Sequence, residues 1–244
     1  MSQAATDATE SARYPLLERI PSAATLALVA GLLNAWTFAN AQAFATVQSG
    51  NIVTVGYEMF AGNWSRVADV SVAIFCFAAG AFLCQLFILL MARRRRPYSG
   101  PVLIIEVAAL VLLGVLAATG TAGPVVLVWA VSFLAGVQGN AFHRETGMVY
   151  GNVAVTFVLQ NVGSLLARAA GNKIATDHQP HVRPAGAYLA VLIAFALGGG
   201  IGFAIDQLWR DAAFFVSAAV LAVFAVVAIT YRGQEDPSGA APTP

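Results

Sequence analysis

The sequence predicts an all-α polytopic membrane protein, a bundle of transmembrane helices. Of its 244 residues, 59% are hydrophobic and only 10% are charged, whereas soluble domains carry about 25% charged residues. The mean hydropathy is +0.74. Six stretches match the length of about 20 apolar residues that crosses a bilayer. They lie at about 22–42, 68–92, 101–118, 124–142, 185–205 and 212–231.

The two ends of the chain are too polar to insert. Residues 1–20 mix Ser, Thr, Asp and Glu with Ala, and residues 233–244 consist mainly of Pro, Gly, Ala and acidic residues. Both segments predict disordered tails, since neither has enough apolar residues for a core. A cleaved signal peptide is the less favoured alternative for the first apolar run, because that run is long enough to span. The transmembrane domain is therefore expected at 21–232.

Two half-polar segments, at 43–62 and 146–168, interrupt the apolar pattern. The first contains Gln48-Ser49-Gly50-Asn51, and the second contains Gly151-Asn152 and Gln160-Asn161. Irregular backbone at membrane depth is tolerated only where protein or a water-filled cavity surrounds it. We therefore expect two re-entrant segments or short half-helices.

Positive charge favours six spans over eight. Cytoplasmic loops are enriched in Lys and Arg. If neither half-polar segment crosses and both termini are cytoplasmic, only Arg66 and Arg210 of the 13 Lys and Arg residues lie outside. If both segments cross, the cluster at 93–96 moves outside and the two sides become nearly equal. Six spans are the prediction, and an eight-span bundle with two short helices is the alternative.

The order of elements then repeats in opposite orientation. Residues 22–118 and 124–231 each read as span, polar segment, span, loop, span, and Ala30-Gly31 with Asn34 is echoed by Ala135-Gly136 with Asn140. Inverted repeats of this kind build many secondary transporters, whose site lies at the midplane between the repeats. The sequence thus predicts a polar cavity where the two halves meet.

The candidate substrate-binding residues are uncharged hydrogen-bonding groups within these repeats. In membrane helices such residues also serve as packing contacts, so for each one a structural role is the alternative, and we interpret Gly198-Gly199-Gly200 and Gly202 as packing residues. The candidates are Asn34, Ser49, Gly50, Asn51, Gln138, Asn140, Thr156 and Asn161.

Acidic residues within spans are costly and usually functional. Glu106 lies about five residues inside its predicted span, so we expect it to reach the interface and pair with the Arg cluster at 93–96. Glu58 follows the first polar segment and lies either at a cavity mouth or in the solvated interface. Asp69, Asp206 and Asp211 lie at span ends. No buried carboxylate is expected at a span centre, so a proton relay is not indicated.

Nothing in the sequence predicts an enzyme, a metal site or a cofactor. His143, His178 and His181 lack the spacing of a metal site. Cys76 and Cys84 are about 12 Å apart along one helix, too far for a disulfide. A net charge of +1 provides no basic face for nucleic acid.

Several short motifs resemble the YoaK family, bacterial membrane proteins of unknown function and similar length. The family pattern usually has Asp at the position of Asn34, Thr-Gly-Asn at Ser49-Gly50-Asn51, and Thr-Gly at Thr156-Phe157. The resemblance implies a polytopic protein of the bacterial inner membrane that transports a small molecule, and it brings no substrate. The matching residues are Ala30-Gly31-Leu32-Leu33-Asn34-Ala35, Ser49-Gly50-Asn51, Gly136-Val137-Gln138, Asn140-Ala141, Val155-Thr156 and Leu159-Gln160-Asn161-Val162-Gly163.

The leading hypothesis is therefore a transporter or permease for a small uncharged or zwitterionic solute. The alternative is a non-transporting membrane scaffold or accessory subunit. The expected partners are the lipid bilayer and a small solute, and a chain of 25.4 kDa is compatible with a homodimer. Both termini are expected in the cytoplasm.

Overall fold

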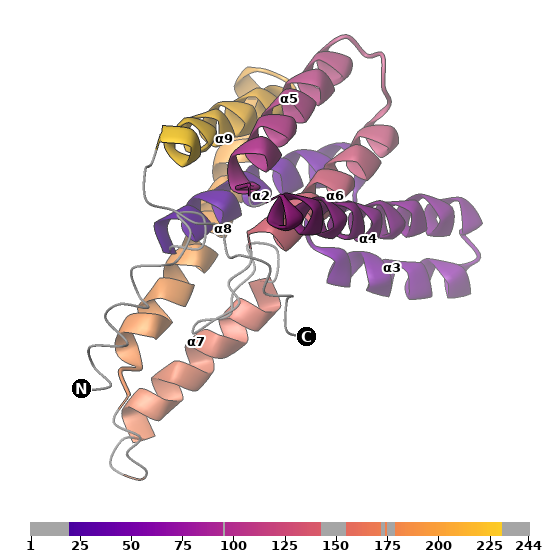
Figure 1. Ribbon diagram of the computed structural model, residues 1–244. Coiled ribbons are helices and arrows are strands. Elements are labelled where there is room, and N and C mark those ends of the chain that lie inside the picture. The colour runs from indigo at the N-terminus through magenta and orange to yellow at the C-terminus, as the bar shows by residue number, and fades with distance from the viewer. Residues whose placement is uncertain (1–19, 95, 143–154, 172–173, 175–178, 231–244) are drawn as a thin grey trace.

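A computed structural model describes residues 20–94, 96–142, 155–171, 174 and 179–230, and the regular structure of these residues is entirely helical (Figure 1). Six helices of this part are long and apolar enough to cross a membrane, namely α2, α4, α5, α6, α8 and α9. The predicted all-α transmembrane bundle is thus confirmed. The predicted tails lie outside the described residues, apart from Ile20. The helices are α2 (Ile20–Ala41), α3 (Gln48–Ala61), α4 (Trp64–Arg93), α5 (Ser99–Ala118), α6 (Pro124–Ala141), α7 (Val155–Ala170), α8 (Val182–Leu208) and α9 (Ala212–Thr230).

The local sequence explains where several of these helices begin and end. Gly62 ends α3 with φ of 78°, a left-handed conformation that glycine adopts without steric cost. The Asn63 side chain then caps α4 by accepting a hydrogen bond from the Arg66 amide at 3.3 Å. Pro124 starts α6 at a position where its fixed φ suits a helix. Gly62 and Asn63 together form the tight turn of a helical hairpin between α3 and α4.

The helices pair across long stretches of sequence: α2 packs on α8, α4 on α6, and α5 on α9. In the first pair Leu28 lies at Gly198 and Leu32 at Gly202, so α2 and α8 run parallel. In the last pair Gly100 faces Ile229 at one end.

Further contacts fix the remaining directions. At the other end of the last pair Gly114 faces Phe215, so α5 and α9 are antiparallel. In the α4 and α6 pair, Trp129 donates to the Asp69 carbonyl at 2.9 Å, and Asn140 donates to Gln85 at 3.0 Å. These two helices are therefore parallel to each other.

Glycines let two of these pairs approach to backbone contact. A Cβ added at Gly31 would lie 2.2 Å from the Phe195 carbonyl oxygen on α8, and one at Gly198 would lie 2.1 Å from that of Leu28 on α2. The α4 and α6 pair repeats the arrangement. There, a Cβ added at Gly80 would lie 2.1 Å from the Phe133 carbonyl oxygen, and one added at Gly136 would lie 2.0 Å from that of Phe77. The two Ala-Gly motifs are therefore closely packed helix crossings.

The short helices α3 and α7 lie beside α4 and α8, respectively (Figure 1). With 14 residues, α3 is about 21 Å long, less than a bilayer core. The Arg66 guanidinium at the start of α4 donates to the carbonyl of Ala41 at 2.9 Å and to that of Gln42. The end of α2 and the start of α4 are thus on the same side, so the whole segment between them, which includes α3, begins and ends on that side.

The second short helix contacts the first halves of two long helices. Val158 and Val162 of α7 pack with Ala23 and Ala27 of α2 and with Tyr188 of α8. Residues 143–154, which include the start of the second predicted polar segment, lie outside the described part.

The pattern of the main helix contacts stays the same when each helix of the first half of the chain is exchanged with its counterpart in the second half. With α2, α3, α4 and α5 matched to α6, α7, α8 and α9, the α2–α8 pair becomes the α6–α4 pair, and the α3–α4 pair becomes the α7–α8 pair. The α5–α9 and α2–α6 pairs map onto themselves. The described helices of the two halves therefore share one pattern of contacts, in which α2 and α6 contact each other.

Candidate functional site

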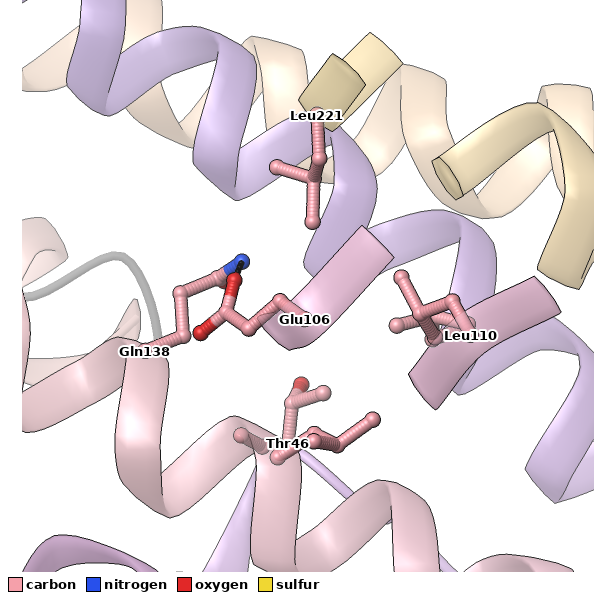
Figure 2. Close-up of a pocket in the computed structure, with 8 residues that line it drawn as sticks. Thr46, Glu106, Leu110, Gln138 and Leu221 are labelled. Atoms are coloured by element: carbon pink, nitrogen blue, oxygen red, sulfur yellow. Dashed lines mark hydrogen bonds between the residues drawn. The ribbon is translucent and has the colours of Figure 1, made fainter. Parts of the chain in front are cut away.

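A small cavity lined by buried residues lies where helices of the two halves meet. The cavity has a volume of about 10 Å³, which is enough for about one water molecule. Its walls come from α2, the connection between α2 and α3, α5, α6 and α9. The lining residues are Leu33, Thr46, Glu106, Leu110, Leu134, Ala135, Gln138 and Leu221 (Figure 2).

The connection between α2 and α3 is non-helical and reaches this cavity through Thr46. Its backbone amides need partners because they lie in a buried part of the bundle. Asn34 accepts a hydrogen bond from the Thr46 amide at 3.0 Å, and the Thr37 hydroxyl accepts one from Ala45 at 3.4 Å. These bonds from α2 hold the Thr46 side chain against the cavity.

Asn51 secures the same connection from the α3 side. Its amide nitrogen donates to the Phe44 carbonyl at 2.6 Å and to the Gln48 side chain at 2.8 Å, and its oxygen accepts from the Phe44 amide at 3.4 Å. Asn51 is 2% exposed. Its role in the structure is to hold the connection in place.

Glu106 is the acidic residue of the cavity, and its predicted place at the membrane interface is wrong. The side chain is 1% exposed, and one carboxyl oxygen accepts a hydrogen bond from Gln138 at 3.3 Å (Figure 2). Arg93, Arg94 and Arg96 are exposed, and no ion pair involving Glu106 occurs among the described residues. The sequence-based expectation of no buried carboxylate at a span centre is wrong as well, because Glu106 is the eighth residue of the 20-residue α5.

Three buried polar atoms around the cavity have no hydrogen-bond partner within the described part of the chain. They are the amide nitrogen of Asn34, the hydroxyl of Thr46 and the second carboxyl oxygen of Glu106. Unsatisfied buried polar groups cost about 1–3 kcal/mol each, and two of these three atoms, on Thr46 and Glu106, belong to residues that line the cavity. Ser132 and Ser217 also have unpartnered hydroxyls, but they do not line the cavity.

The eight sequence-predicted site residues are distributed over several places. Gln138 lines the cavity and Asn34 supports it, while Ser49 is exposed on α3. Gly50 packs near Phe44, and Asn51 holds the connection. On α6, Asn140 bonds to Gln85 of α4. On α7, Thr156 is exposed, and Asn161 donates to the Phe157 carbonyl of its own helix. The structure thus brings Asn34 and Gln138 together with Thr46 and Glu106.

A second buried acid lies at the turn between α8 and α9. Asp211 is 6% exposed and accepts a hydrogen bond from the Trp36 indole of α2 at 2.8 Å. Its amide donates to Asp206 at 2.9 Å. The ring of Trp36 also packs against Phe214, with centroids 4.7 Å apart. This cluster fastens the end of α2 to the start of α9.

Comparison with known proteins identifies a family but no characterised relative. The profile of a family described as "Protein of unknown function (DUF1275)" matches residues 22–227. No curated protein matches the chain, and no solved structure does.

Proposed function

This chain belongs to the DUF1275 family of membrane proteins, and we propose that it transports a small uncharged or zwitterionic solute through the central cavity. The observation that carries the proposal is the group of unpartnered polar atoms on Asn34, Thr46 and Glu106 where the two halves meet. Transporters built from inverted repeats bind their substrate at this place.

The helix arrangement supports alternating access. The two halves of the chain are interleaved, since α2 of the first half packs on α8 of the second, α4 on α6, and α5 on α9, with the short helices α3 and α7 beside α4 and α8. The cavity of about 10 Å³ has room for about one water molecule, so a solute would need a wider form of the cavity. Rocking of the α2–α8 pair, with α7, against the α4–α6 pair, with α3, would widen the cavity toward one side at a time.

The chemistry of the cavity favours a neutral or zwitterionic solute. Amide and hydroxyl groups from Asn34, Thr46 and Gln138 can replace the hydration of polar groups, and among the lining residues no cationic side chain is present to hold an anion. Leu33, Leu110, Leu134 and Leu221 form the apolar remainder of the wall. Only a small solute fits such a site.

Expectations about the membrane, the orientation of the chain and its oligomeric state also belong to this proposal. The chain resides in the bacterial inner membrane with both termini cytoplasmic, because the exposed Arg93, Arg94 and Arg96 end α4 whereas Arg66 and Arg210 lie at the other ends of the spans. It acts alone or as a homodimer. The likeness to the YoaK family also stays a proposal.

The test is solute flux into liposomes that contain the purified full-length protein. We would use labelled glycine, glycerol and urea as probes, with empty liposomes as the baseline. Thr46→Val removes the unpartnered hydroxyl while it preserves shape. We expect at least a ten-fold loss of flux for the probe that is transported, with stability unchanged or raised by about 1 kcal/mol.

The matched control for this variant is Ser217→Ala. It also removes an unpartnered buried hydroxyl, but outside the cavity, so flux should stay at the wild-type level. The proposal fails if no probe moves faster than in empty liposomes, or if both variants have the same flux.

A membrane scaffold or accessory subunit is the second candidate function. It is favoured by the close glycine crossings at Gly31 and Gly136, which give the two Ala-Gly motifs a purely structural role. On this alternative Thr46→Val raises stability and changes no flux, and the protein copurifies with another membrane protein from its native membrane.

A further inference from the structure

Glu106 is isolated from all other charges of the central helices. The sequences of α2, α5, α6 and α9 contain no other Asp, Glu, His, Lys, Arg, Cys or Tyr. An ionisable group at membrane depth is rare and is usually functional. An uncharged amide, such as that of Gln138 on the facing helix, would be sufficient for a role that required only hydrogen bonding.

Few titratable groups face Glu106 from the surrounding elements. On α4, the buried thiol of Cys84 is close enough to interact with it electrostatically. Tyr98, at the start of α5, donates to the Ala141 carbonyl at 3.4 Å. Asp211 is bonded to Trp36 at the far turn. No described cation neutralises the carboxyl group, so its charge can change only if it binds a proton or a cation.

The geometry leaves one carboxyl oxygen of Glu106 available. The other oxygen accepts from Gln138 at 3.3 Å, which fixes the orientation of the group. The available oxygen and the Thr46 hydroxyl are both buried without a partner, and both residues line the cavity that holds about one water. A single water placed there can hydrogen-bond to both groups and carry a proton to the carboxylate.

We propose that Glu106 is the proton-binding residue that couples solute transport to the proton gradient, an inference that rests on the proposed transport function. The carboxylate takes up one proton from the aqueous side to which the cavity opens, and the carboxylic acid releases it on the other side. No other bond forms or breaks. Protonation removes the uncompensated charge of the buried carboxylate, so the solute-loaded protein changes access in the protonated form, and the solute-free protein returns after the proton has been released.

Infrared spectroscopy of the full-length protein in liposomes tests proton binding without a known solute. We expect a carbonyl band of a protonated carboxylic acid whose intensity changes with pH in the wild type and which is absent in Glu106→Gln. Glutamine keeps an oxygen that accepts from Gln138, so thermal stability in detergent should stay close to the wild-type value. A band that does not change with pH overturns the proposal. A change produced by Na⁺ at fixed pH also overturns it, in favour of a cation site.

Flux measurements separate this inference from the proposed function. A proton gradient should accelerate uptake of the transported probe at least five-fold in the wild type and in Glu106→Asp, but not in Glu106→Gln. Flux that ignores the gradient in the wild type overturns proton coupling and leaves transport intact. A pH-dependent band without any flux overturns the transport function but supports Glu106 as a proton-binding residue.

Discussion

Asn51 holds the α2–α3 connection through both ends of its side-chain amide. Two of its hydrogen bonds satisfy the amide and carbonyl of Phe44, which lie outside any helix, and a third goes to the Gln48 side chain. Asn51→Ala should therefore lower the unfolding free energy by about 1–3 kcal/mol. Thermal unfolding in detergent measures the change.

Asn161→Ala is the control for this prediction at the residue scale. Within the described part of the chain, the side chain of Asn161 makes one exposed hydrogen bond, to the Phe157 carbonyl of its own helix, so its replacement should change stability by less than about 0.5 kcal/mol. Equal losses for both variants would contradict the structural role of Asn51.

Glu106 shows how far single residues could be placed from the sequence. Its distance from the start of the span predicted an interfacial position, yet Ser99 and Gly100 at that start are themselves buried. The signal that could have found it is helical register: Glu106 lies four residues after Val102 and four before Leu110, on the face that packs inward. Thr46 carried no comparable signal, because its place depends on hydrogen bonds from α2 in a non-helical segment.

At the element scale, the glycines decide which helices can touch. Gly136→Ala should destabilise the protein by about 1–3 kcal/mol, since the new methyl group would lie 2.0 Å from the Phe77 carbonyl oxygen and must push α4 and α6 apart. Gly163 on α7 has nothing within 4 Å of an added Cβ. Gly163→Ala should instead stabilise by about 0.5–1 kcal/mol, because alanine loses less backbone entropy in a helix. The melting temperatures of the two variants should therefore move in opposite directions.

The sequence located the elements better than it located their partners. Length and hydropathy predicted the six long helices, because both are local properties. Gly198 and Gly202 were correctly interpreted as packing residues, whereas Gly199 and Gly200 would have open space around an added Cβ. Nothing local marks α2 as the partner of α8, since that pairing depends on the shapes of two distant surfaces.

At the scale of the whole molecule, the helix directions determine the topology. Since α2 and α8 are parallel, α5 and α9 antiparallel, and consecutive helices joined by short turns reverse direction, α2, α5 and α8 run one way and α4, α6 and α9 the other. Two helices of opposite direction flank each short helix, so the segment that links α2 to α4 and the one that links α6 to α8 each begin and end on one side. These directions are those of the six-span prediction, in which positive charge gathers on one side.

Accessibility labelling tests this topology in intact cells, with Cys76 and Cys84 first replaced by alanine. Single cysteines are then introduced at the last residue of α3 (Ala61→Cys), directly after α4 (Arg94→Cys) and after α5 (Thr121→Cys). We expect an impermeant maleimide to label positions 61 and 121 from outside, because both lie on the side where α2 ends. Position 94 should react only after the membrane is opened.

A cysteine in the C-terminal tail, Ser238→Cys, supplies the reference side for this experiment. The end of α9 lies beside the start of α5, where Gly100 faces Ile229, so position 238 should share the side of position 94. If α3 and α7 both crossed the membrane, position 61 would instead react on the same side as position 238. That outcome would show that the segment between α2 and α4 crosses the membrane. It would thereby contradict the inverted arrangement that places the cavity between the two halves.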